Sequence, residues 1–162
     1  IGYTQQAALP TRKIDASVGF INNDFVQFEL AGVNVIALPI TEGSAPPLVG
    51  ASLFTTRSFV VEHPEIAKWV AEAMAKGIDA TAADQSAAVE TAAKYIPDMT
   101  EQAKKAAKAT LGATLKIMLK DGKASKSLDP AQWQAMAVFL ADAKVLSSIP
   151  DVSQVVGDTW HE

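Results

Sequence analysis

The fold is decided by residues 16–40, which have the sequence ASVGFINNDFVQFELAGVNVIALPI. Two apolar runs, ASVGFI (Ala16–Ile21) and VNVIALPI (Val33–Ile40), lie at its ends, and the polar triplet Asn22-Asn23-Asp24 follows the first run. Short apolar runs bounded by turn-forming residues are typical of buried strands. We therefore expect one strand at each end of this stretch.

The residues between the two runs favour a helix. The positions that fit about one and a half helical turns are Phe25, Phe28, Glu29 and Leu30. Gly32 suits the position that follows a helix end. A strand, a short helix and a second strand form a compact βαβ unit, which implies a parallel sheet and an α/β fold class.

The composition changes near residue 62. Residues Ile1–Val61 are rich in Val, Ile, Phe, Gly and Pro, whereas Glu62–Glu162 are dominated by Ala, Lys, Gln and Glu. The first part is expected to hold strands and short helices, and the second to be Ala-rich and helical. The further elements expected in the first part are a short helix at Gln5–Lys13 that contains Pro10, a turn-rich connection at Thr41–Pro47 and strand-like residues at Leu48–Val61.

Start and stop signals predict four helices in the second part. Asp and Thr before an apolar-periodic segment are typical helix caps, and Pro suits the first helical position. The expected helices are one from Pro64 to Gly77, one at Gln85–Tyr95 capped by Asp84, one at about Glu101–Lys120 capped by Thr100 and stopped by Asp121-Gly122, and one opened by Asp129-Pro130; a last turn is expected at Val152–Val156.

Composition excludes several classes of protein. The chain has 162 residues, a net charge of −4, 49% hydrophobic and 20% charged residues, and no cysteine. It is too apolar for a disordered segment, too charged for a membrane bundle, and poorly suited to nucleic acid, which requires basic side chains. The length suggests one domain. Because Ile1-Gly2-Tyr3-Thr4 has the pattern of the middle of a strand, we expect a processed or truncated chain.

No signature of catalysis or of metal binding is present. The sequence contains no GxSxG, HExxH, P-loop or GxGxxG motif, and His63 and His161 are far apart. We interpret both histidines as surface residues, and we expect no catalytic residue, metal or cofactor. Trp69 and Trp133 lie on Ala-rich helices and are expected to be packing anchors.

The segment Gly19–Asp24 is the candidate binding site. It lies where a predicted parallel strand ends and a helix begins, and ligands of open α/β sheets bind beyond the carboxyl ends of strands. Two amides and a carboxylate can hydrogen-bond a polar heterocycle or a zwitterion, and Phe20 can supply a flat apolar wall. The alternative is structural: Asn22 or Asn23 caps the helix, and Asp24 stabilises its first turn.

Several stretches together resemble a known family. They are Ile14–Asp24 with Ala31–Val35, the segment LFTTRSFVVEHPE (Leu53–Glu65) leading into the helix from Pro64 to Gly77, the next helix around Glu90, and Tyr95-Ile96-Pro97. In order and spacing, over about residues 1–145, they resemble ABC-importer solute-binding proteins of the branch related to thiamine-pyrimidine, riboflavin, taurine, sulfonate and nitrate binders.

The resemblance implies a type II periplasmic binding fold, in which two α/β lobes joined by a hinge clamp the ligand. Residues 1–40 would be the later part of the second lobe, residues 41–61 would cross the hinge and return, and residues 62–162 would be the helical C-terminal part of the first lobe. Only the C-terminal half of the family fold is matched. The missing N-terminal half, or a second copy of the chain, is therefore an expected partner.

The resemblance also implies a function. The chain would be the substrate-binding component of an ABC importer, periplasmic or lipid-anchored at the outer face of the inner membrane, that delivers a small polar or heteroaromatic nutrient to the permease. No enzyme activity is expected. The alternatives are a ligand-binding enzyme or sensor on the same fold, and a helical interaction domain without a ligand.

Site residues follow from the same resemblance. Phe20 would wall the ligand, and Asn22, Asn23 and Asp24 would hydrogen-bond it. Tyr3 and Thr4, at a strand end, are further candidates, and Gly43 and Ser44 would let the crossover bend. The chain has Asp24 where the family often has Glu, and Phe20 where Tyr or Trp is common, so the preference for a particular ligand stays open.

Overall fold

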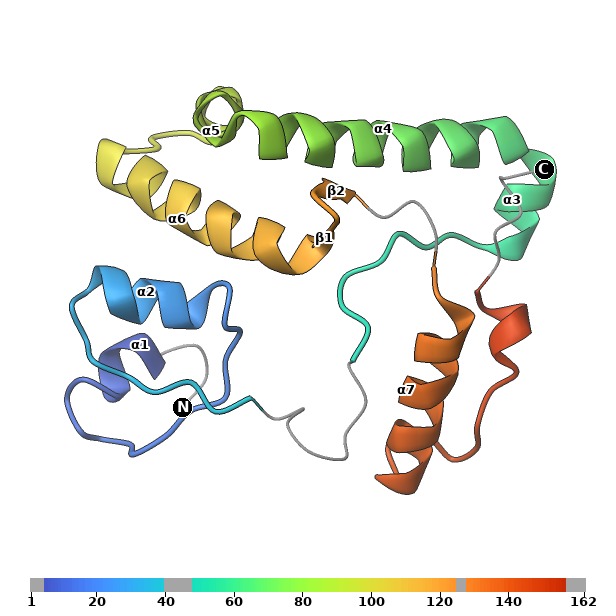
Figure 1. Cartoon of the computed structure of the whole chain (residues 1–162), viewed down its shortest axis with the longest axis horizontal. Helices are drawn as coiled ribbons and strands as arrows, with labels where there is room; N and C mark the ends of the chain where they lie inside the picture. The colour runs from blue at the N-terminus through green and yellow to red at the C-terminus, as the bar shows by residue number, and fades with distance from the viewer. Residues whose placement is uncertain (1–4, 40–47, 125–127, 157–162) are drawn as a thin grey trace. The chain divides into compact units, whose positions relative to one another are not determined.

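A computed structural model describes residues 5–39, 48–124 and 128–156 (Figure 1). The chain forms two compact units, each made of two separate segments. The first unit contains Ile1–Leu38 and Gly77–Ala124, and the second contains Pro39–Lys76 and Ser125–Glu162. Each unit is considered by itself below.

The described residues are mostly helical. The helices are α1 (Gln5–Ala8), α2 (Asp24–Leu30), α3 (Arg57–Glu62), α4 (Pro64–Ala83), α5 (Gln85–Ala93), α6 (Glu101–Met118), α7 (Pro130–Asp142) and the 3₁₀ turn η1 (Val152–Gln154). Two short strands, β1 (Leu119–Lys120) and β2 (Lys123–Ala124), pair antiparallel through a turn at Asp121-Gly122. Both turn residues have positive φ angles, 53° and 77°, as a tight hairpin requires.

Side-chain caps set the helix starts where the sequence predicted them. The Asp84 carboxylate accepts a hydrogen bond from the Ala87 N–H at 2.9 Å, and the Thr100 hydroxyl accepts one from the Ala103 N–H at 3.2 Å. Asp129 caps α7, which begins at Pro130. These predicted caps are confirmed, as are the start of α4 at Pro64 and the helix over Phe25–Leu30, now α2.

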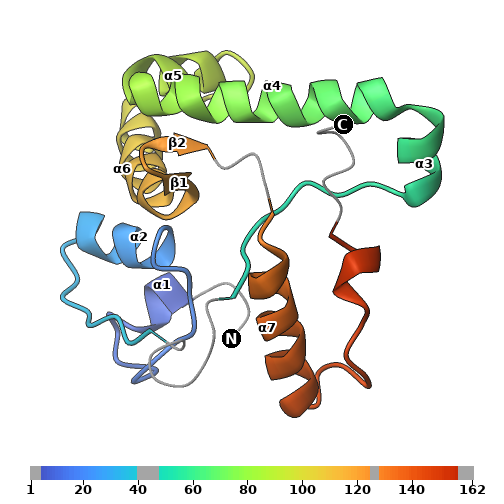
Figure 2. The ribbon, with the colours of Figure 1, turned by 45° about the vertical axis from the view of Figure 1, so that its right-hand side comes forward.

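In the first unit, α6 packs against α5 and α2, as the views in Figures 1 and 2 agree. The buried side chains on these helices are Val26, Phe28, Val89 and Leu115. Lys104 on α6 donates to Glu90 on α5 at 2.9 Å and lies 3.0 Å from Glu101. Both carboxylates raise the pKa of Lys104, Glu90 most strongly, but they are exposed, so the pairs contribute little to stability.

The hairpin β1–β2 is tied to α4 by one polar contact. The Asp79 carboxylate accepts a hydrogen bond from the Ala124 N–H at 2.8 Å. Asp79 belongs to the C-terminal part of α4, which lies in the same unit as the hairpin. The contact therefore fixes the end of the hairpin against that part of the helix.

In the second unit, α7 and η1 share a small hydrophobic cluster. Its buried members are Ala137, Val152 and Val156, and the half-buried Leu128 and Trp133 pack against it. The Arg57 guanidinium, at the start of α3, donates to the Gln154 carbonyl oxygen at 2.9 Å. Trp133 is thus a packing anchor, as expected. The same prediction was wrong for Trp69, whose side chain is 62% exposed.

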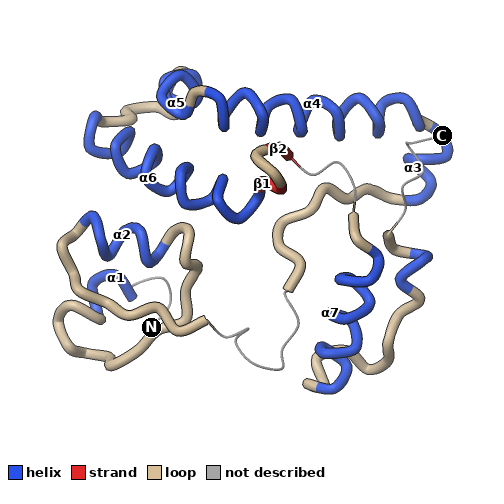
Figure 3. Tube along the Cα trace, viewed as in Figure 1, coloured by secondary structure: helices blue, strands red, loops and turns tan. Residues whose placement is uncertain are grey.

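The predicted strands of the βαβ unit are not formed. Ala16–Ile21 and the described part of Val33–Ile40 are irregular, as Figure 3 shows by their loop colour, and Leu48–Val61 contains helix α3 instead of a strand. A strand needs a hydrogen-bonded neighbour, and within the described residues neither of the first two segments pairs with one. The Thr56 cap satisfies an N–H of α3 locally, which favours a helix there.

Three predicted helix ends were wrong. The helix expected to run to Lys120 ends at Met118, because Leu119–Lys120 form strand β1 of the hairpin. The helix expected over Gln5–Lys13 is only α1, Gln5–Ala8, because Pro10 cannot continue the hydrogen-bonded ladder. The helix expected to stop at Gly77 runs on to Ala83. A glycine inside a helix costs only about 1 kcal/mol relative to alanine, and the alanines that follow favour the helix enough to continue it.

We predict that Trp133→Ala lowers the free energy of unfolding by about 2–3 kcal/mol, less than for a fully buried tryptophan because Trp133 is half-buried. Trp69→Ala is the matched control, since it removes the same side chain from an exposed position, and should cost less than about 1 kcal/mol. Urea unfolding of both variants measures the difference. Equal losses would contradict the packing role of Trp133.

The turn η1 should depend on pH. The Ser153 hydroxyl and backbone N–H donate to the Asp151 carboxylate at 2.6 Å and 3.0 Å, which lowers the pKa of Asp151, the hydroxyl bond having the larger effect. This stabilisation is present above the ordinary pKa of an aspartate, about 4, and is lost as the pH falls through the lowered value.

The measurement is an NMR pH titration of the Val152 and Ser153 amides between about pH 6 and 2.5. We expect a transition below the ordinary midpoint of an aspartate in the native chain. Asp151→Asn keeps a side chain able to cap the turn and should abolish that transition. A midpoint at or above the ordinary value would refute the capping role of Asp151.

Candidate functional site

The structure brings Phe20, Asn22, Asn23 and Asp24 together in one loop at the start of α2. The Asp24 carboxylate oxygen Oδ2 accepts a hydrogen bond from the Phe20 N–H at 2.8 Å. The Asn23 N–H donates to the Phe20 carbonyl oxygen at 3.1 Å. The loop is therefore closed on itself by two short hydrogen bonds.

Asn22 ties this loop to a distant part of the chain. Its Nδ2 donates to the Thr114 hydroxyl on α6 at 2.9 Å. On α2 itself, the Gln27 Nε2 donates to the Thr110 hydroxyl at 3.2 Å. Both contacts lie within the first unit, so α6 holds the loop in place from outside it.

The other two side chains face solvent. Phe20 is 73% exposed, and Asn23 is exposed as well. Asn23 occupies the residue before α2, but its side chain makes no capping hydrogen bond. Of the structural roles predicted for this loop, Asp24 does lie in the first turn of α2, and it also accepts the Phe20 N–H. Neither asparagine caps the helix, because Asn23 makes no capping hydrogen bond and Asn22 donates to Thr114.

Gly19 is required by the position of Asp24. A Cβ atom at residue 19 would lie 2.9 Å from the Asp24 Cβ and 3.0 Å from its Oδ2. That separation is too short for a real side chain, so only glycine lets the carboxylate reach the Phe20 N–H. Gly19 and Asp24 together thus determine the closed conformation of this loop.

The remaining predicted site and hinge residues lie outside the described residues. They are Tyr3, Thr4, Gly43 and Ser44. His161 lies outside them too. His63 is described, and its ring meets the Phe59 ring edge-on, with 5.1 Å between centroids.

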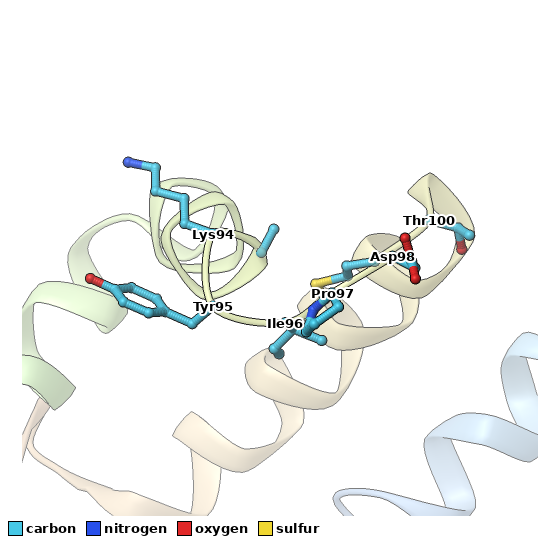
Figure 4. A pocket seen from close by; sticks show the side chains of 8 residues that line it. Lys94, Tyr95, Ile96, Pro97, Asp98 and Thr100 are labelled. Carbon is cyan, nitrogen blue, oxygen red and sulfur yellow. The ribbon is translucent and has the colours of Figure 1, made fainter.

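A shallow hollow, not anticipated from the sequence, lies on the loop between α5 and α6. It has a volume of about 580 Å³ and is lined by Ala93–Thr100. Figure 4 shows Lys94 and Tyr95 pointing away from Asp98, so its polar groups do not converge on a common point. It offers a surface depression and no set of aligned ligand-binding groups.

Neither a metal site nor a membrane-spanning helix is found in the described ranges. In 5–39, 48–124 and 128–156, no cluster of three or more His, Asp or Glu side chains is arranged to hold a metal ion. No helix among those residues combines the length and apolarity needed to cross a membrane.

The chain belongs to the NMT1/THI5-like family. The family model described as NMT1/THI5 like matches residues 1–88, more than half of the 162 residues. This family is associated with the solute-binding proteins of ABC transporters, in agreement with the resemblance found in the sequence. Neither the curated proteins nor the solved structures contain a match to the chain.

Gly19→Ala tests the geometry of the loop. We expect the free energy of unfolding to fall by about 1–3 kcal/mol, because the added methyl group overpacks against Asp24. Gly50→Ala is the control: no atom lies within 4 Å of the place its added methyl group would take, so a change within about 0.5 kcal/mol is expected. Thermal unfolding followed by circular dichroism compares the two, and a neutral Gly19→Ala would show that the loop is not closed by Asp24.

Proposed function

We propose that this chain is part of the substrate-binding component of an ABC importer, which captures a small polar or heteroaromatic nutrient. The observation that carries the proposal is the family match over residues 1–88, which includes the whole Gly19–Asp24 loop. The loop adds chemical support, since it combines an exposed aromatic ring with amide and carboxylate groups on one short segment.

The proposed binding mode assigns each side chain a task. Phe20 walls one face of the ligand, and its exposure leaves the ring available for stacking. Asn22, Asn23 and Asp24 hydrogen-bond the polar edge of the ligand. The loop is held by hydrogen bonds before a ligand arrives, so little ordering is needed on binding.

The proposed mechanism is closure of two lobes around the ligand. In this proposal residues 1–40 belong to one lobe together with Gly77–Ala124, which form one compact unit with Ile1–Leu38. Residues 41–61 cross the hinge, and the remainder of residues 62–162 belongs to the other lobe. Tyr3 and Thr4 add ligand contacts, and Gly43 and Ser44 let the crossover bend. Contacts made from both lobes stabilise the closed state, because a ligand shifts an equilibrium only through its differential affinity for the two states.

The proposal includes partners and a location. The closed protein delivers its ligand to a membrane permease, and it works in the periplasm or anchored by lipid at the outer face of the inner membrane. The remaining lobe segments come from an N-terminal half or from a second copy of the chain. The exposed side chains of Val18 and Ile36, 84% and 86% accessible, are apolar surface that such a partner would cover.

We further propose that the chain binds its ligand without transforming it. The exposed polar groups at Phe20–Asp24 include no nucleophile paired with a base, which acyl transfer or hydrolysis would need. An enzyme or a sensor on the same fold is the alternative, and turnover of a bound compound would favour it. A helical interaction domain is the second alternative, and it requires that Phe20–Asp24 be dispensable.

The test is a thermal-shift panel of an aminopyrimidine, riboflavin, taurine, an alkanesulfonate and nitrate. A compound present at about 100 times its dissociation constant should stabilise the protein by about 2.7 kcal/mol. Phe20→Ala should weaken binding of that compound by roughly 5- to 10-fold through loss of the aromatic contact. Isothermal titration measures the affinity.

Phe54→Ala is the matched control, because Phe54 is 91% exposed and lies outside the loop. It should leave the affinity within about twofold of the native value. Asn23→Ala and Asn34→Ala form a second pair, of which only the first should weaken binding. Equal effects within each pair, or no binding by any compound, would contradict the proposed function.

A further inference from the structure

A chain of two hydrogen bonds runs from the loop into α6. The Thr114 hydroxyl donates to the Thr110 carbonyl oxygen at 2.8 Å, and the Asn22 Nδ2 donates to the Thr114 hydroxyl at 2.9 Å. A hydroxyl has one proton, and a carbonyl oxygen can only accept. Toward Asn22 the Thr114 hydroxyl is therefore an acceptor, and only the NH₂ end of the amide satisfies it.

This constraint fixes which end of the Asn22 amide faces away from α6. With Nδ2 committed to Thr114, the carbonyl oxygen Oδ1 lies on the opposite side of the planar amide. Without Thr114, the amide is free to rotate and to offer either a donor or an acceptor. Because Asn22 is half-buried, the orientation of its amide affects the free energy of ligand binding: a donor or acceptor left without a partner there is costly.

Asp24 also makes the loop richer in hydrogen-bond acceptors. Its Oδ2 accepts from the Phe20 N–H, which removes that backbone donor from the loop surface. The carboxylate brings negative charge and a second oxygen, Oδ1. The Phe20 N–H and one of the two N–H donors of the Asn22 amide are thus used in internal contacts, whereas the Asn22 Oδ1, the Asp24 Oδ1 and a negative charge remain.

We propose that Thr114 is a positioning residue for the ligand site, and that the site takes a neutral or cationic ligand with N–H donors in preference to an anion. The inference rests on the proposed function and deepens it. Thr114 holds the Asn22 amide so that its oxygen accepts from the ligand, and Asp24 repels anions such as sulfonates and nitrate.

Thr114 lies outside the part of the chain that the family model covers. The match ends at residue 88, within α5, whereas Thr114 is on α6. The contact joins positions 92 residues apart. The assignment therefore comes from the three-dimensional contact alone, and it connects α6 to ligand recognition.

The test compares Thr114→Val, which has the same shape without the hydroxyl, with Thr114→Ser, which keeps it. Thr81→Val is the control, a half-buried threonine on α4. The first readout is the ¹H–¹⁵N spectrum of the side-chain amides, in which only three asparagines contribute signals, Asn22, Asn23 and Asn34. Thr114→Val should shift the Asn22 NH₂ signals, whereas Thr114→Ser and Thr81→Val should leave them in place.

The second readout is affinity for two probes, 4-aminopyrimidine and methanesulfonate. The native chain should bind the aminopyrimidine more tightly. Thr114→Val should weaken that binding by roughly 3- to 10-fold, the loss expected from one hydrogen bond, and Thr114→Ser should restore it.

Three results would overturn the inference. Tighter binding of methanesulfonate by the native chain would refute the ligand class while leaving the proposed function intact. Native affinity in Thr114→Val would refute the positioning role. Binding of neither probe, nor of any compound in the thermal-shift panel, would contradict the proposed function and this inference with it.

Discussion

The Thr114 hydroxyl has a single proton, which it donates to the Thr110 carbonyl oxygen. It can therefore only accept the hydrogen bond that joins α6 to Asn22 in the loop at Phe20–Asp24. The Asn22 amide donates to the Thr114 hydroxyl through its NH₂ group, and the Asp24 carboxylate closes the other side of the loop by accepting from the Phe20 N–H. Helix packing supplies the apolar part of the same contact, through buried Val26 and Phe28 on α2 and Leu115 on α6. The orientation of polar groups on the loop is thus fixed by an element that begins 77 residues after Asp24 (101 − 24).

Helices were predictable from the sequence where their signals are local. Asp84 and Thr100 each accept a hydrogen bond from the N–H three residues on, and such a contact needs nothing outside its own turn. Strands were not predictable in the same way. The apolar runs at Ala16–Ile21 and Val33–Ile40 have strand-like composition, but a strand exists only when a second segment completes the ladder, and the described residues provide none for them.

The candidate site was predictable in part. The combination of an aromatic ring, two amides and a carboxylate is visible in Phe20–Asp24, and the structure does bring those residues into one loop. The sequence left open whether Asp24 serves a ligand or the loop itself, and the structure shows that one of its oxygens serves the loop. Thr114 was not predictable, because a threonine inside an Ala-rich helix gives no local signal of a tertiary contact and its partner lies 92 positions away.

The proposed function requires that Phe20–Asp24 be the ligand-binding loop of a solute-binding protein. The decisive measurement is a ¹H–¹⁵N NMR titration with whichever panel compound binds most tightly, followed at every backbone amide. We expect the largest shifts to fall on Phe20–Asp24, with a smaller response at Thr114. Shifts confined to the hollow at Ala93–Thr100, with Phe20–Asp24 unchanged, would contradict the assignment of the loop.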